Sequence, residues 1–182
     1  MTTSFRIQRW LYYRLWFPVV SLWCNLVEYS YAPRKFFSAK RLLRLAENVA
    51  VAEFAAAQAN TIFGAPVRWA LVSVTGGLSY REDNGDWQAW PRTTLLKGYG
   101  DCEDFAALNA YLLKRLGYKP VLWRLFRSSG SAHTVVATQD WHWLVSEKKT
   151  IDLKAHMEQT GESDPKKALL SALSVRYEEV WK

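Results

Sequence analysis

Cys102, His133 and Asp152 are residues of the types that nucleophilic catalysis needs, and they occur in that order along the chain. A thiolate attacks a carbonyl carbon, an imidazole takes and returns the proton, and a carboxylate orients the imidazole. Cys102 lies in the segment GYGDCEDF, where Asp101 and Glu103 flank it directly. Acidic neighbours raise the pKa of a thiol and suppress the reactive thiolate, so an active cysteine here needs an opposing influence.

The element expected around Cys102 supplies such an influence. Asp101 can cap a helix by accepting backbone N–H groups two or three residues on, and Gly117 with Pro120 is placed to end that helix. Cys102 then lies in the first turn, where unpaired N–H groups and the positive end of the helix dipole favour a thiolate. The helix is predicted from one apolar stripe, formed by Phe105, Leu108, Leu112 and Leu116.

A meander of strands is expected to carry the other two residues. Alternating and β-branched residues predict strands over 121–126, 133–138, 141–146 and 150–153, with a turn at 147–149. In such a meander we expect adjacent strands to present His133 and Asp152, which makes a Cys–His–Asp triad geometrically reasonable. His142 and His156 are rival bases.

The remaining elements predict an α+β fold in which helices pack on one side of a small antiparallel sheet. Apolar spacing predicts a helix that starts after Ser38 as N-cap, and another after Asp164 as cap. Residues 68–77 fit a helix or a strand, and residues 78–100 are expected to be mostly loop.

The net charge of +7 lies in the N-terminal quarter, because residues 1–44 hold eight basic residues and one acidic residue, while the rest hold 16 of each. Residues 1–37 are therefore interpreted as a basic, aromatic arm, and residues 38–182 as the domain. The balanced body gives no reason to expect nucleic acid. The apolar run 15–27 is too short to span a bilayer, and no convincing signal peptide is evident, which leaves the compartment open. The arm suits a membrane-surface anchor or a docking arm, or a first helix that packs on the domain.

The segment GYGDCEDFAALNAYLLKRLGY resembles the nucleophile helix of transglutaminase-like proteins. Together with REDNGDWQAWP ahead of it, the segment is similar to the bacterial transglutaminase-like cysteine proteinases, and the resemblance covers roughly residues 75–155. It implies a papain-like fold, with Cys102 as nucleophile, His133 as base and Asp152 as orienting acid. Residues 38–182 would then be a transglutaminase-like cysteine peptidase domain.

The resemblance also implies Ca²⁺ bound by Asp101 and Glu103. Ca²⁺ prefers carboxylate and carbonyl oxygens, and two acids are too few, so Asp83 or Asp86, backbone oxygens or water would have to contribute. Alternatively, Asp101 only caps the helix and the other acids favour its positive end. The predicted function is a calcium-dependent thiol peptidase that cleaves a protein substrate. The alternative is a transamidating or non-catalytic protein that is a structural, docking component of a membrane-associated or virion assembly.

Overall fold

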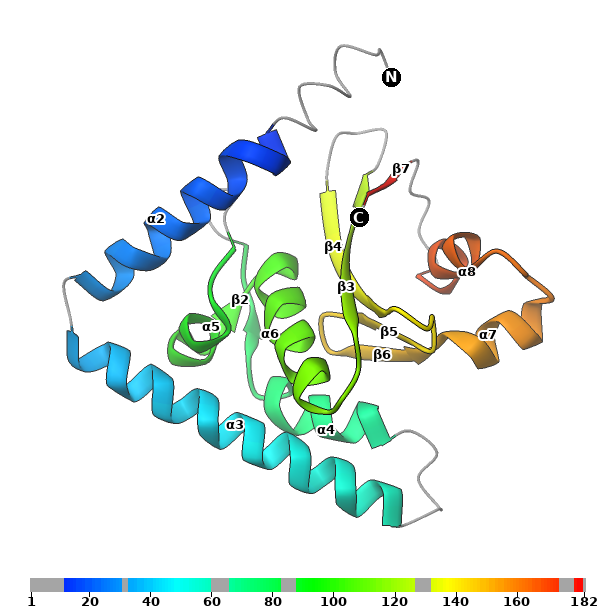
Figure 1. Cartoon of the computed structure of the whole chain (residues 1–182), viewed down its shortest axis with the longest axis horizontal. Coiled ribbons are helices and arrows are strands. Elements are labelled where there is room, and N and C mark those ends of the chain that lie inside the picture. The colour runs from blue at the N-terminus through cyan, green and yellow to red at the C-terminus, as the bar shows by residue number, and fades with distance from the viewer. Residues whose placement is uncertain are drawn as a thin grey trace.

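The chain places its long helices first and its main sheet last (Figure 1). The computed structural model describes residues 12–30, 33–59, 66–82, 88–126, 132–173 and 179–181. A π-helical turn, Tyr12–Trp16, leads into α2 (Phe17–Ser30), which α3 (Pro33–Ala59) follows. Because α3 is already helical at Pro33, the expected helix start after Ser38 is wrong, and α3 runs unbroken through residues 37 and 38.

The region between α3 and the nucleophile contains more regular structure than the sequence indicated. Most of residues 68–77, which fitted a helix or a strand, lie in α4 (Pro66–Thr75). The expected loop contains β1 (Ser79–Tyr80), α5 (Pro91–Lys97) and β2 (Tyr99–Gly100), and β1 pairs with β2 in parallel. Proline begins α5, and Gly98 ends it with a φ of 74° that glycine adopts without strain.

The helix predicted around Cys102 and the strands after it are confirmed. The helix is α6 (Cys102–Arg115), and Gly117, with a φ of 89°, closes it. The strands are β3 (Pro120–Phe126), β4 (Ala132–Thr138), β5 (Trp143–Ser146) and β6 (Lys149–Asp152). They pair antiparallel in the order β6-β5-β4-β3-β7, where β7 is Glu179–Trp181.

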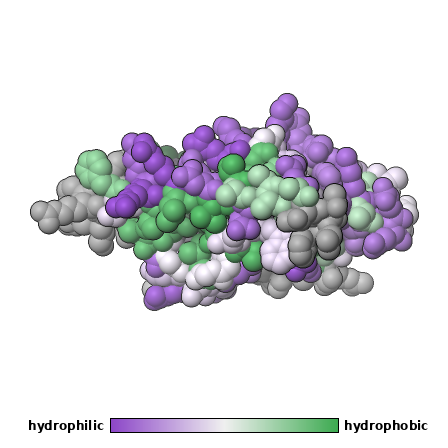
Figure 2. Space-filling model, turned by 90° about the horizontal axis from the view of Figure 1, so that it is seen from below, coloured by the Kyte–Doolittle hydropathy of each residue, from purple (hydrophilic) through white to green (hydrophobic). Residues whose placement is uncertain are grey.

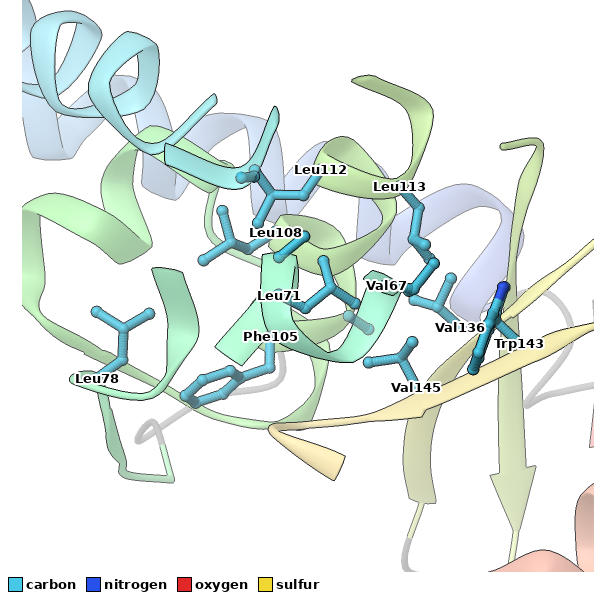
Figure 3. Close-up of a cluster of buried hydrophobic side chains, with 13 residues drawn as sticks. Val67, Leu71, Leu78, Phe105, Leu108, Leu112, Leu113, Val136, Trp143 and Val145 are labelled. Atoms are coloured by element: carbon cyan, nitrogen blue, oxygen red, sulfur yellow. The ribbon is translucent and has the colours of Figure 1, made fainter. Parts of the chain in front are cut away.

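Helices cover both faces of this sheet, and not one face as expected. Alternate residues of a strand point to opposite faces, so Val136 packs toward α6 while Val135 packs toward α7 (Leu153–Thr160) and α8 (Pro165–Ala172). Asp164 caps α8 as predicted. The core on the α6 side is drawn in Figure 3, where the labelled side chains from α4, α6 and the sheet are Val67, Leu71, Phe105, Leu108, Leu112, Leu113, Val136, Trp143 and Val145, with Leu78 nearby.

The N-terminal helices leave apolar side chains in solvent. Seen from below, apolar side chains gather over the part of the surface that α3 forms, with hydrophilic regions around them (Figure 2). Leu42, Leu45 and Val51 are among the exposed residues of α3. Of the helices in the described residues, none combines the length and the apolar character that crossing a membrane requires.

Candidate active site

Cys102 is the first residue of α6, and the chain ahead of it is shaped to hold it there. Asp101 is the N-cap as predicted, because its Oδ1 accepts the backbone N–H groups of Glu103 at 3.0 Å and Asp104 at 3.2 Å. A side chain at Gly100 would have its Cβ 2.6 Å from that of Asp104, so this close approach requires glycine. The cap accepts the amides of Glu103 and Asp104, and not that of Cys102, which is the first residue of the helix.

The surroundings of Cys102 keep its thiol protonated at neutral pH. Burial raises the pKa of Cys102 to about 12, and the charges of Glu103, Asp101 and Glu147 act in the same direction. The backbone N–H of Thr134 lowers the pKa but does not offset the burial. Burial, which the sequence alone does not show, therefore acts together with the acids to keep the thiol protonated.

His133 directly precedes Thr134 on β4, so the backbone amide that reaches the Cys102 thiol belongs to the residue after the histidine. The His133 Nε2 atom lies 2.9 Å from the Ser146 Oγ atom of β5. If Nε2 carries the proton and donates it to Ser146, Nδ1 is the nitrogen that can act as a base. The structure thus places Cys102 against the backbone of β4 at the residue after His133, and Ser146, which the sequence reasoning missed, contacts the imidazole.

Asp152 lies elsewhere, and the expected adjacency of the strands that carry His133 and Asp152 is wrong because β5 separates β4 from β6. Asp152 pairs with Trp143, at the opposite end of β5 from Ser146. Three residues of strand correspond to roughly 10 Å. The Asp152 carboxylate accepts the Ala155 backbone N–H at 3.0 Å as the N-cap of α7. Its other oxygen lies 3.6 Å from His142 Nε2.

The two rival histidines make contacts of their own outside this region. His142 faces Asp152 and stacks on Trp143, with ring centroids 4.6 Å apart. His156 Nε2 lies 2.8 Å from the Ser171 Oγ atom, between α7 and α8. These contacts leave His133 as the histidine whose strand position adjoins the cysteine. In the observed register Ser146 is diagonal to His133 across an antiparallel hairpin with a turn at 139–142, so the register of that hairpin is the signal that identifies it.

The acids proposed for calcium are engaged with the protein. Asp101 caps α6, and the buried Glu103 carboxylate lies 3.7 Å from Arg124 Nη2 on β3. Among the residues that the structure describes, no group of three His, Cys, Asp or Glu side chains could hold a metal ion. Asp83 and Asp86 lie outside the described residues. The described donor set does not fit Ca²⁺, which takes six to eight oxygens, so no step below involves it.

Two further residues interact electrostatically with the thiol. Tyr80 on β1 pairs with Gly100, and burial together with the charges of Cys102 and Glu147 raises the pKa of its phenol. Glu147 lies in the β5–β6 turn with a φ of 53°, and burial raises the pKa of its carboxyl. Lys148, next in the turn, donates to the backbone oxygen of Leu78 and ties this turn to the segment before β1. Tyr80 and Glu147 were not predicted from the sequence, since strand pairing and a turn bring them to Cys102.

The loop before α5 is fixed from the N-terminal side by α2. Asn25, fully buried, donates to the Gln88 backbone oxygen at 2.8 Å and accepts from the Trp90 backbone N–H at 2.8 Å. The neighbouring Ala89 N–H donates to Asp104, two residues after Cys102, at 2.6 Å. Part of the arm is therefore a structural element of the domain.

Comparison with known families places most of the chain. A family model described as a transglutaminase-like domain matches residues 27–168, which is well over half of the chain. None of the curated proteins matches. The matched segment includes α6 and the meander β3–β6. Ser21 and Asn25, through which α2 contacts the loop before α5, lie just ahead of the matched segment.

Proposed function

Because the chain belongs to the transglutaminase-like family, we propose that it is a thiol-dependent acyl-transfer enzyme that cleaves an amide bond of a peptide or protein through Cys102. The proposal includes a papain-like arrangement, in which the nucleophile begins a helix and the base lies on a neighbouring strand. The observation that carries it is the contact of the Cys102 thiol with the backbone N–H of Thr134, the residue next to His133. Asp101 holds the helix start by its cap.

The first half of the reaction makes a thioester. His133 Nδ1 takes the thiol proton as Cys102 Sγ attacks the carbonyl carbon, because the resting thiol is protonated. The Cys102 backbone N–H donates to the resulting oxyanion. The imidazolium then gives its proton to the leaving amine, and the C–N bond breaks.

The second half of the reaction regenerates the thiol. Water attacks the thioester carbonyl while His133 takes its proton, the C–S bond breaks, and the proton returns to sulfur. A primary amine in place of water would make the product of transamidation. Ser146 is the positioning residue for His133 in this scheme. The resemblance to the family is the remaining reason to predict Asp152 as an orienting acid, and the contacts of Asp152 favour a structural role as the α7 cap.

Peptide cleavage tests the proposal directly. The full chain and Cys102→Ala would be incubated with a peptide library from a proteome digest, and new termini read by mass spectrometry, with and without a dansylated amine. We expect new termini or amine incorporation from the wild type alone. Equal cleavage by Cys102→Ala would refute Cys102 as the nucleophile.

A non-catalytic role is the second candidate, and one observation favours it: the raised pKa of Cys102. In that case the thiol reacts with iodoacetamide no faster than its pKa alone dictates, and His133→Ala leaves the rate unchanged. If Cys102 and His133 instead form a catalytic pair, the rate of Cys102 alkylation near neutral pH should fall in His133→Ala.

A further inference from the structure

α2 turns an apolar face to solvent. Two tryptophans of this face are the most prominent: Trp16, just before α2, is 61% exposed, and Trp23, within α2, is 68% exposed. Residues of this face recur three and four positions apart, so they form one stripe along a helix. The stripe, here called the outward face, consists of Leu15, Trp16, Val19, Leu22, Trp23, Leu26 and Val27.

The opposite side of α2 fixes this orientation. Phe17, Ser21 and Asn25 are buried against the domain. Ser21 Oγ accepts the Gln88 backbone N–H at 2.9 Å, and Asn25 Oδ1 accepts from the Thr93 hydroxyl at 3.1 Å. A surface helix of a globular protein ordinarily buries its apolar stripe and exposes its polar one, whereas α2 does the reverse. Rotation of α2 to bury the outward face would break the bonds of Asn25, so within the described residues this face stays exposed.

The position of α2 and the charges of the segments on either side of it indicate what covers it. α2 lies along the outer edge of the molecule, away from the sheet (Figure 1). Its 14 residues span about 21 Å, which is too short to cross a bilayer but suits a helix lying in its plane. Exposed basic residues occur on both sides of it in sequence, at Arg14 and, on α3, at Lys40, Arg41 and Arg44.

We propose that the outward face of α2 docks on the surface of an anionic lipid bilayer, with the apolar side chains at the acyl boundary. Tryptophan favours the interface between headgroups and acyl chains, and the basic excess of residues 1–44 complements anionic headgroups. A second copy of the chain is a poorer occupant. It would bring the same basic segment against itself, and the seven residues that define the outward face include no acid to pair with it.

Vesicle binding of the full chain tests this docking. Phosphatidylcholine vesicles with and without phosphatidylglycerol would be the probes, in a co-sedimentation assay at low and high salt. We expect binding to the anionic vesicles that weakens as salt rises, with a blue shift of tryptophan emission. Absence of binding to anionic vesicles overturns the proposal.

A matched pair of variants assigns the binding to α2. Trp23→Glu places a charge on the outward face, and Trp69→Glu makes the same change at a half-exposed tryptophan on α4. Trp23→Glu should weaken partitioning by on the order of tenfold or more, while Trp69→Glu retains it. Leu22→Glu is a second variant of the outward face in case Trp23→Glu does not fold, which thermal unfolding reveals.

Two outcomes contradict the docking on lipid. Equal vesicle binding by wild type, Trp23→Glu and Leu22→Glu would remove α2 from the binding surface. Concentration-dependent dimers that these substitutions abolish, found together with no vesicle binding, would assign the outward face to a second copy. Light scattering after gel filtration makes that measurement.

Discussion

Replacing Ser146 by aspartate tests whether the contact between His133 and Ser146 belongs to the chemistry. Ser146 Oγ lies 2.9 Å from His133 Nε2, and serine carries no charge. A carboxylate at this position stabilises an imidazolium more than a hydroxyl does. Ser146→Asp should therefore favour transfer of the Cys102 proton to His133 and so raise the population of the thiolate–imidazolium pair.

The size of the effect follows from the distance and the partial exposure of Ser146. A carboxylate in contact with a histidine raises the imidazole pKa by about one to two units when solvent screens part of the charge. Each unit corresponds to about 1.4 kcal/mol and to a tenfold larger population of the pair. Alkylation of Cys102 by iodoacetamide should accordingly become about ten to a hundred times faster near neutral pH.

The assay measures alkylation rates of the variant across pH in a Cys24→Ser background, because Cys24 is a second free thiol. Ser146→Asn is the matched control, since it has nearly the size of aspartate without the charge. The wild-type rate should rise through the neutral and mildly alkaline range without levelling off, because the pKa of Cys102 is raised to about 12. Equal rates for Ser146→Asp and Ser146→Asn would refute the assignment of His133 as the base.

Three other predictions concern stability, and urea unfolding measures the free energy of unfolding in each. From about pH 8 to about pH 10.5 the wild type should lose about 2 kcal/mol more stability than Cys102→Ser. The folded thiol, with a pKa raised from 9.0 to about 12, keeps a proton in this range that the unfolded thiol releases. Parallel curves of stability against pH for the two proteins would contradict the raised pKa. Arg124→Met should cost about 2–4 kcal/mol by leaving Glu103 buried without its cation, and adding Glu103→Gln should restore part of it; no recovery would place the cost in packing. Asn25→Leu should cost about 2–4 kcal/mol and speed hydrogen exchange at the loop before α5, since buried backbone groups lose their partner; unchanged exchange would show that the loop does not depend on α2.

The parts of the fold that follow local rules could be predicted from the sequence. The start of α6 needs only the short-range bond from Asp101 to the next amides, and its end needs the left-handed conformation that Gly117 provides. The same kind of signal was present for α5, in Pro91 and Gly98, but seven residues carry too few apolar positions for a clear period.

The site depends on contacts that local rules do not determine. Whether Asp152 or Ser146 meets His133 is decided by the strand order and by the pairing of β4 with β5, which the alternation of side chains alone leaves open. The helix start after Ser38 was placed by an N-cap preference, whereas α3 begins at Pro33, a residue type that is common at the first helical position. The hydrogen bonds of Asn25 join residues more than sixty positions apart, and nothing in the apolar sequence around Asn25 indicates that it makes such contacts.

The link between α2 and the nucleophile decides how the arm can be studied. The Arg124 guanidinium lies 4.0 Å from the centre of the Phe17 ring, and the same side chain pairs with Glu103, one of the acids that raises the pKa of Cys102. Removing residues 1–30 would thus expose Arg124 and change the field at the thiol along with the docking surface. Loss of activity in such a truncation could not be assigned to either cause. Substitutions on the outward face leave Phe17 and Asn25 in place, so they separate attachment from catalysis.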